Sequence, residues 1–232
     1  MVLLKILNAY AGIGGNRKNW DGDKHDIVAV EINEEIAEEY GRLYPEDEVV
    51  VGDAHTYIKE HYNEFDFIWA SPPCPTHSQM HLLSAKSDKK QNKNREADYP
   101  DMRLYQEIIL LKNFFDGDWA VENVRPYYKP LIKPQKCGRH RIWSNFTVPD
   151  VEVPRGFDLT GASTRAKIED LEEWLGIHLS KNIYVKDSHD SGQVLRNAVH
   201  PKIGEAILNS RNVKQKSLAG VREKTTGEGG TE

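Results

Sequence analysis

The stretch from Ala70 to Ser78, "ASPPCPTHS", places a cysteine between prolines directly after an apolar run. Cys74 is one of two cysteines in the chain, and Cys137 is the other. Proline fixes the backbone and removes an N–H donor, so this loop is stiffer than packing requires. A structural cysteine is commonly buried among apolar neighbours, whereas this one follows a strand-like segment in a rigid loop. We therefore interpret Cys74 as a nucleophile directed at a ligand.

A carboxylate and a basic stretch accompany this thiol. Glu122 lies near the end of another apolar run, "DWAVENV". Between Asn123 and Val148 the chain has no Asp or Glu, although its formal net charge is −5. In isolation such a run is more often a solvated surface, but phosphate binding depends on local fields rather than on the mean charge. The cationic residues of this stretch are Arg125, Lys129, Lys133, Lys136, Arg139 and Arg141.

A glycine-rich turn and two carboxylates indicate a nucleoside pocket. The turn "AYAGIGG" contains three glycines that allow close approach of a ligand: Gly12, Gly14 and Gly15. Glu31 follows Gly12 by nineteen residues, where a carboxylate can accept hydrogen bonds from both hydroxyls of a ribose. Asp53 ends the next strand-like segment and is a second acceptor, suited to an adenine amino group. Arg17 stands where the dinucleotide pattern requires a third glycine or alanine, which disfavours NAD or FAD.

The elements that must position these residues follow from the hydrophobic pattern. The pattern predicts strands over residues 3–10, 25–32, 47–54, 65–71 and 118–124. It predicts helices over 33–44, 104–115 and 167–177, and a turn into a helix over 11–20. Alternating strands and helices predict an α/β fold with a doubly wound, mostly parallel sheet covered on both faces. Ligands in such sheets bind at the carboxyl ends of the strands, where Cys74 and Glu122 are expected to be neighbours.

Composition limits the remaining choices. With 232 residues, 38% of them hydrophobic, the chain is expected to form a single core. No apolar run approaches the roughly 18 residues that span a bilayer, and "MVLLKIL" lacks the cleavage site of a signal peptide. The spacing of Cys and His fits neither a disulfide framework nor a zinc site. These features predict a cytoplasmic protein with a free Cys74 thiol, no membrane segment and no metal.

The order of these motifs resembles the cytosine-5 DNA methyltransferase family, over most of residues 3–209. "AYAGIGG" is similar to the first motif, "VEIN" to the second, "GDA" to the third and "PPCPTHS" to the fourth. "YPDMRLYQE" resembles the fifth, "ENV" the sixth, "GRHR" the eighth and "LRNAVHP" the tenth. Any one of these segments can arise by chance, whereas the full set in this order is difficult to explain so.

The resemblance implies a class I S-adenosylmethionine-dependent methyltransferase of Rossmann-like fold with S-adenosyl-L-methionine as cofactor. It assigns catalytic roles to Cys74, Glu122, Arg139 and Arg141. It assigns cofactor binding to Tyr10, Ala11, Gly12, Ile13, Gly14, Gly15, Glu31, Ile32, Asp53, Ala54, Pro73, Asn197 and Val199. The substrate it implies is duplex DNA, methylated at C5 of a flipped-out cytosine through a covalent bond between Cys74 and C6. The basic stretch, with Arg139 and Arg141, is expected to lower the pKa of the thiol.

The sequence departs from the family at several positions. Pro75 replaces the usual Gln after the nucleophile, Cys137 replaces the Gln that leads the eighth motif, and Arg196 replaces a Gly in the tenth. The expected domain boundaries are 1–209 for the catalytic domain and 210–232 for a disordered tail. Within the domain, only about residues 145–195 remain for a minimal target-recognition region, which resembles the compact, phage-like members of the family. This resemblance implies a phage or restriction-modification context. We expect a monomer with a short or degenerate target.

Two alternatives stay open. An RNA methyltransferase acting on tRNA has the same catalytic set, and a non-catalytic nucleic-acid-binding protein would retain the basic stretch without needing Cys74.

The segment 79–100 is polar and lysine-bearing, and we predict a mobile lid over the substrate in preference to a plain solvent loop.

Overall fold

The computed structural model describes residues 3–79, 82–83, 99–157, 166–185 and 190–211. The predicted lid falls largely on 80–81 and 84–98, and the predicted tail on 212–232, so both lie outside the described residues. Parts of the predicted target-recognition region, 158–165 and 186–189, lie outside them as well.

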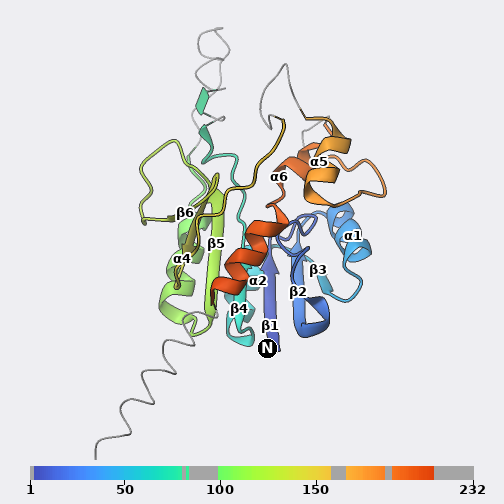
Figure 1. Ribbon diagram of the computed structural model, residues 1–232. Coiled ribbons are helices and arrows are strands. Elements are labelled where there is room, and N and C mark those ends of the chain that lie inside the picture. The colour runs from blue at the N-terminus through green and yellow to red at the C-terminus, as the bar shows by residue number, and fades with distance from the viewer. Residues whose placement is uncertain (1–2, 80–81, 84–98, 158–165, 186–189, 212–232) are drawn as a thin grey trace, which may run out of the picture.

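A seven-stranded sheet in the order β3-β2-β1-β4-β5-β7-β6 forms the centre of the described structure (Figure 1). Its strands are β1 (Leu4–Ala9), β2 (His25–Glu31), β3 (Glu48–Val51), β4 (Phe67–Ala70), β5 (Asp118–Val124), β6 (Gln135–Cys137) and β7 (His140–Ser144). The first five strands pair in parallel, while β7 pairs antiparallel with β5 and β6 antiparallel with β7. The predicted mostly parallel sheet is therefore confirmed. The β6–β7 hairpin is an addition that the sequence pattern did not predict.

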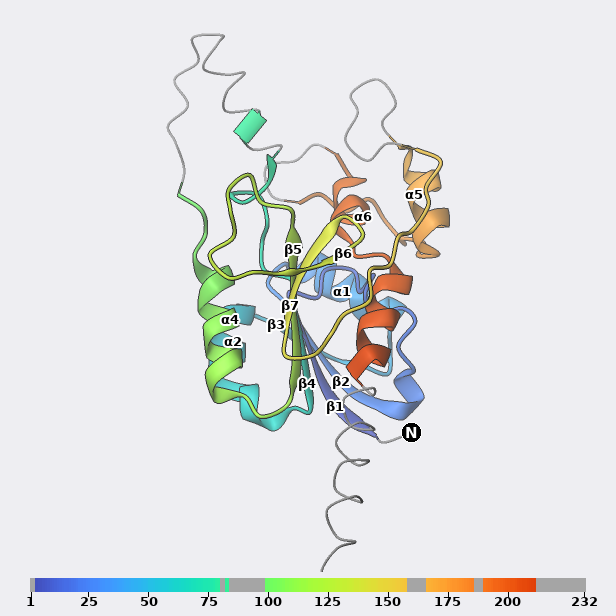
Figure 2. The same cartoon turned by 60° about the vertical axis from the view of Figure 1, so that its left-hand side comes forward.

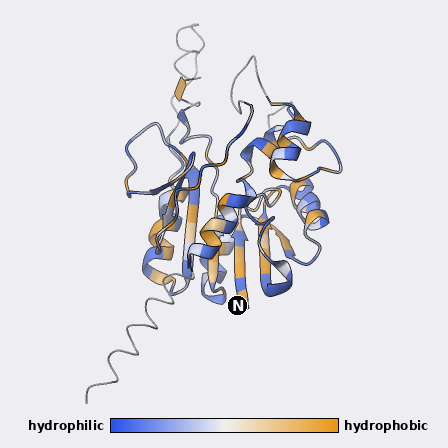
Figure 3. Ribbon diagram, viewed as in Figure 1, coloured by the Kyte–Doolittle hydropathy of each residue, from blue (hydrophilic) through white to orange (hydrophobic). Residues whose placement is uncertain are grey.

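Helices cover both faces of the sheet (Figure 2). One face packs against α2 (Ala54–His61) and α4 (Arg103–Phe114), whose buried residues form one cluster with Leu7, Val28 and Val121. The other face packs against α1 (Glu34–Leu43) and a helix over residues 201–211. Successive residues of a strand point to opposite faces of the sheet. Because helices cover both faces, the strands are apolar along most of their length (Figure 3).

Smaller elements complete the fold. Two 3-10 helices, η1 (Gly22–Lys24) and η2 (Tyr62–Glu64), precede β2 and β4. The helices α5 (Ile168–Leu175) and α6 (Gln193–Asn197) pack with Ile13 and Ile36, above the carboxyl ends of the strands in Figure 1. The predicted helix at 167–177 is thus present, and it ends at Gly176 in the left-handed region (φ 62°).

The expected helix over 11–20 is absent, and this prediction was wrong. A series of turns occupies the segment, with the N–H of Gly14 bonded to Ala11 O and that of Arg17 to Gly14 O. Gly12 and Gly14 have positive φ angles of 55° and 71°, which an α-helix does not contain. The Arg17 side chain ties this segment to the turn after α1, because its buried guanidinium forms ion pairs with Asp47 at 2.7 Å and Glu46 at 2.7 Å. The segment is therefore held by side-chain contacts and not by a helical pattern of backbone hydrogen bonds.

Helix starts follow their capping residues. The helix predicted to begin at Asn33 is present as α1, and the Asn33 side chain accepts the Ile36 N–H at its start. Asp53 accepts the N–H groups of His55 and Thr56 at the start of α2. Across the described ranges, no helix combines the length and apolarity needed to cross a membrane.

Candidate active site

The loop after β4 holds Cys74 in a fixed position. Asn123 at the end of β5 donates from Nδ2 to Pro72 O at 3.0 Å. The Cys74 carbonyl accepts from His77 N at 3.0 Å, and the buried His77 ring bonds Asp101 O at 2.9 Å through Nε2. Because β4 and β5 are parallel neighbours, this loop and Glu122 lie at one edge of the sheet. The structure therefore brings Cys74 and Glu122 together, as the topology argument required.

The thiol of Cys74 differs from the expectation. Burial, and after it the negative charge of Glu122, raise the pKa of the Cys74 thiol to about 11. Arg139 lowers it, but by less than these two effects raise it. The expected activation of the thiol by the basic stretch is therefore not present in the free protein. The proton stays on sulfur at neutral pH until something else accepts it.

Glu122 has the opposite shift. Burial alone raises its pKa, but His140 and then Arg139 outweigh burial, with a smaller contribution from Ser71, so the pKa of Glu122 lies below its usual value. His140 Nδ1 lies 2.6 Å from Glu122 Oε1, and both side chains are more than nine-tenths buried. Arg139 Nε lies 3.2 Å from His140 Nε2. The site thus combines a protonated thiol with an ionised carboxylate.

The two arginines of "GRHR" differ in position. Arg139 Nη2 donates to the carbonyl oxygens of Arg196 at 3.4 Å and Ala198 at 3.5 Å, which joins the eighth and tenth motifs. Arg141 pairs with Asn123 in the β5–β7 register, so its side chain leaves the strand on the opposite side from His140. Its Nη1 donates to His140 O at 2.8 Å. The structure brings Arg139 to the carboxylate and does not bring Arg141 there, whose catalytic role stays a prediction.

The basic stretch is partly neutralised by the segment that follows it. Lys136 forms ion pairs with Asp150 at 2.8 Å and Glu152 at 3.4 Å. Lys136 is therefore less available for phosphate than the charge count indicates. Arg125, Lys129 and Lys133 are exposed.

The predicted cofactor residues lie at the carboxyl ends of β1, β2 and β3. Glu31 accepts the Gly12 N–H through Oε2 at 3.0 Å and the Asn33 N–H through Oε1 at 2.9 Å. A Cβ at Gly12 would have no heavy atom within 4 Å, so the turn leaves open space at this point. Ile32 is 69% exposed directly beside Glu31, an apolar surface of the kind that a purine ring covers.

The other members of the set contribute differently. A Cβ at Gly14 would collide with Tyr44, and one at Gly15 with the Val199 carbonyl. Gly14 and Gly15 therefore admit protein neighbours, and of the three glycines only Gly12 leaves open space, where the approach of a ligand stays a prediction. Ala11, Ile13, Ala54 and Val199 have buried side chains, Asp53 caps α2, Asn197 accepts from Gln193 Nε2 at 2.7 Å, and Pro73 is exposed.

A buried acid that the sequence reasoning missed fixes Tyr10. The Tyr10 hydroxyl donates to Glu107 Oε1 of α4, and His55 Nδ1 lies 3.0 Å from the same oxygen. Tyr10 has a positive φ of 56°, which is uncommon for a residue with a side chain. Burial raises the pKa of Glu107, and its Oε2 has no hydrogen-bond partner among the described residues. The sequence contained one indication of this contact: Glu107 lies on the apolar side of the helix predicted over 104–115.

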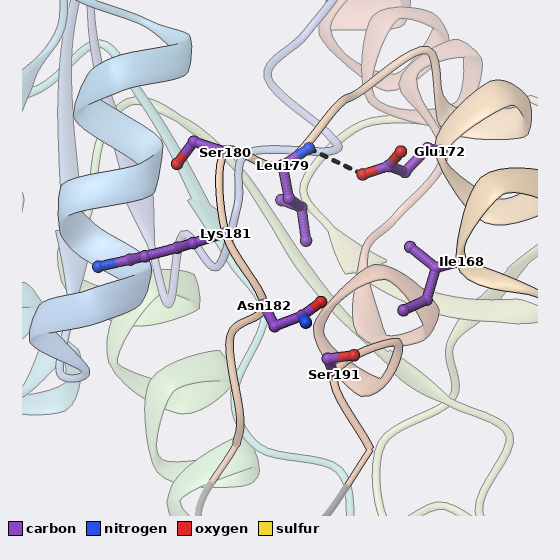
Figure 4. A pocket seen from close by; sticks show the side chains of 7 residues that line it. All are labelled: Ile168, Glu172, Leu179, Ser180, Lys181, Asn182 and Ser191. Carbon is purple, nitrogen blue, oxygen red and sulfur yellow. Dashed lines mark hydrogen bonds between the residues drawn. The ribbon is translucent and has the colours of Figure 1, made fainter.

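The described residues line at least two hollows. One, of about 360 Å³, is lined by Arg139 together with Glu152, Arg155, Trp174 and four neighbours. The other, of about 280 Å³, lies between α5 and the segment 179–182 and shares no residue with the predicted site (Figure 4). Leu179 N donates to Glu172 Oε1 across it at 2.9 Å. Only the first hollow adjoins the candidate active site.

This sheet order, with the predicted cofactor and catalytic residues at the carboxyl ends of the parallel strands, is that of the class I S-adenosylmethionine-dependent methyltransferase fold. Within that class, the family described as "C-5 cytosine-specific DNA methylase" matches residues 4–102. The resemblance read from the motifs is thus confirmed over these residues, which include Cys74 and the predicted cofactor residues up to Pro73. Glu122, Arg139 and Arg141 lie beyond the matched range.

Solved structures give only a distant likeness. A putative methyltransferase, yhhF, from Escherichia coli is 12% identical with a TM-score of 0.36, covering 61% of this chain and 75% of that one. TrmN from Thermus thermophilus is 13% identical with a TM-score of 0.39, covering 61% and 43%. These scores are too low to carry an assignment, which the sheet order and the family match support instead. No curated protein matches the chain.

Proposed function

We propose that the protein transfers a methyl group from S-adenosyl-L-methionine to C5 of a flipped-out cytosine in duplex DNA, through a covalent bond between Cys74 and C6. The observation that carries this proposal is the pairing of Cys74 with Glu122 at the ends of neighbouring strands. The family match of residues 4–102 supports the reaction class and the cofactor.

The proposed chemistry balances the protons of these two groups. Sγ loses its proton as it bonds to C6, and N3 of the ring gains one as negative charge develops there. Glu122 is ionised beside a protonated thiol, so it is suited to accept the first proton and to share the second with N3. The attack therefore needs no free thiolate and leaves the net charge of Cys74, Glu122 and the ring unchanged. C5 then becomes nucleophilic enough to take the methyl group of the sulfonium, whose sulfur leaves as a neutral thioether. Loss of the C5 proton to water re-forms the C5–C6 double bond and breaks the bond from C6 to Sγ, and the proton at N3 returns to Sγ through Glu122.

The carboxyl ends of β1 to β3 fit the cofactor. Glu31 is oriented by two backbone N–H groups and retains lone pairs for ribose hydroxyls, while Gly12 leaves open space and Ile32 provides an apolar surface. S-adenosylmethionine supplies the electrophilic methyl group. No group of three or more His, Cys, Asp or Glu in the described ranges is arranged to hold a metal ion.

The test is methyl transfer from labelled S-adenosylmethionine to duplex DNA and, in parallel, to tRNA. We expect label in DNA at C5 of cytosine and none in tRNA. Labelling of tRNA alone would make the protein an RNA methyltransferase, and binding of DNA without transfer by an intact protein would make it a binding protein.

We further propose a short target of roughly two to four base pairs, because each supported bidentate contact contributes only about 1–3 kcal/mol of discrimination. Residues 145–157 contain bends but no helix or strand. Within the described part of the recognition region, α5 is the one helix that lies entirely inside it, since α6 begins only at Gln193. Phosphate contacts from the basic stretch then supply much of the affinity, which should fall steeply with salt. Bisulfite sequencing of random-sequence duplexes methylated by purified protein would contradict this if it gave a strict site of six or more base pairs, on the order of a restriction site.

A further inference from the structure

His140, the residue between the two arginines of "GRHR", lies where it can control Glu122. In the antiparallel β5–β7 pair, Glu122 is opposite Ile142 and Val124 is opposite His140. Glu122 and His140 are therefore diagonal neighbours on one face of the sheet. Their side chains are only 9% and 5% exposed, and His140 Nδ1 lies 2.6 Å from Glu122 Oε1. A buried carboxylate at this distance is held in one orientation.

The second ring nitrogen of His140 decides which atom carries the proton. Arg139 Nε lies 3.2 Å from His140 Nε2, and an arginine Nε–H can only donate. His140 Nε2 must then accept, so the proton of the neutral ring is on Nδ1. The Nδ1–H donates to Glu122 Oε1. Arg139, His140 and Glu122 thus form one directed hydrogen-bond chain that ends at the carboxylate.

Arg139 is itself anchored outside the hairpin. Its Nη2 donates to the carbonyl oxygens of Arg196, in the last turn of α6, and Ala198, directly after α6. The orientation of Glu122 is therefore linked through His140 to the tenth motif. Neither the basic stretch nor the Arg-x-Arg pattern requires a histidine at this position.

We propose that His140 is a positioning residue: its Nδ1–H fixes the rotamer of Glu122, so that the carboxylate meets the Watson–Crick edge of the cytosine. The inference rests on the proposed function for its catalytic consequence, while its structural part stands on the hydrogen-bond chain alone. His140 does not touch the substrate in this account.

Three variants separate the donor role from packing. His140→Asn places an amide N–H at the position of Nδ1, His140→Gln places one at the position of Nε2, and His140→Ala removes both. We expect kcat for methyl transfer to fall roughly 10- to 100-fold in His140→Ala and His140→Gln, the cost of a misplaced catalytic group. In His140→Asn most of the rate should return. KM for S-adenosylmethionine should stay unchanged in all three.

Two outcomes of these assays would overturn the proposal. One is a His140→Ala rate equal to that of the wild-type protein, and the other is a His140→Gln rate equal to that of His140→Asn, which would reduce the role to packing. Thermal unfolding of each variant shows whether a loss of rate is only a loss of fold. If the wild-type protein transfers no methyl group, the proposed function fails, and the hydrogen-bond chain is judged by the next measurement.

Nitrogen-15 NMR of the imidazoles tests the chain without any reaction. The chain has nine histidines, and the signal of His140 is the one that disappears in His140→Asn. We expect its Nδ1 to be a protonated donor and its Nε2 an acceptor, and the Nδ1 signal to shift in Glu122→Gln. A ring protonated on Nε2, or a signal that ignores Glu122→Gln, would overturn the proposal.

Discussion

The carboxyl ends of β1 to β3 and those of β4 and β5 form one edge of the sheet but differ in how their carboxylates are held. At the cofactor end, Glu31 and Asp53 accept backbone N–H groups from their own turns and helix starts. At the thiol end, Glu122 is held by the His140 side chain of the neighbouring strand β7 and lies beside a thiol whose pKa is raised. The carboxylates of the first end are thus oriented before any ligand binds. At the second end the proton is on Sγ of Cys74 and not on Glu122, so under the proposed function the thiol stays inactive until the flipped-out cytosine arrives.

Glu122→Gln should separate the two ends most clearly. Glutamine keeps the shape but cannot carry the proton that moves from Sγ to N3, so we expect kcat to fall roughly 10²- to 10³-fold, the range for loss of one such group. Binding of S-adenosylmethionine, measured by calorimetry, should not change. Glu60→Gln on the exposed side of α2 is the matched control. Equal losses in binding and rate would mean that the two ends are not independent.

The pH dependence of Cys74 alkylation tests the inactive thiol. Because the pKa of Cys74 is raised to about 11, the reactive thiolate is a minor species below that pH, and its fraction rises about tenfold per pH unit. We expect the iodoacetamide rate of the free protein to rise roughly 100-fold from pH 7.5 to 9.5 without levelling off. Peptide mass spectrometry separates Cys74 from the buried Cys137. A plateau near an ordinary thiol pKa, about 8.5, would contradict the account.

Glu31→Ala should weaken S-adenosylmethionine binding by about 1.5 to 3 kcal/mol, the range for hydrogen bonds to a charged group. Turnover should recover substantially at saturating cofactor, because the thiol end is untouched. Glu60→Ala provides the control. Unchanged affinity by calorimetry would show that the ribose assignment is wrong.

Tyr10→Phe should have the smallest effect and should act on stability. The change removes the hydroxyl that donates to the buried Glu107 and leaves Oε1 with His55 alone. We expect the free energy of unfolding in urea to fall by about 1 to 2 kcal/mol. A variant as stable as the wild-type protein would show that Glu107 does not hold the turn.

The sequence predicted the parts of this structure that depend on local pattern. The five parallel strands, the start of α1 at Asn33 and the meeting of Cys74 with Glu122 follow from apolar periodicity and from the rule that the carboxyl ends of parallel strands lie at one end of the sheet. The β6–β7 hairpin was missed because "QKCGRHRIWS" is charged and short, and its strandedness comes from pairing with β5. The link from His140 to Glu122 depends on the register of that pairing, and the link from Glu107 to Tyr10 on the packing of α4. Contacts of this kind are set by tertiary structure, which periodicity does not contain.

The most direct test of the central claim is covalent trapping on duplex DNA that contains 5-fluorocytosine at the target, with S-adenosylmethionine present. Fluorine at C5 cannot leave as a proton does, so the account predicts an irreversible adduct whose protein attachment maps to Cys74. Cys74→Ala should form no adduct while still binding the cofactor. An adduct that persists in Cys74→Ala would assign the nucleophile elsewhere, to the only other thiol, Cys137, or to another residue type, and would contradict the account.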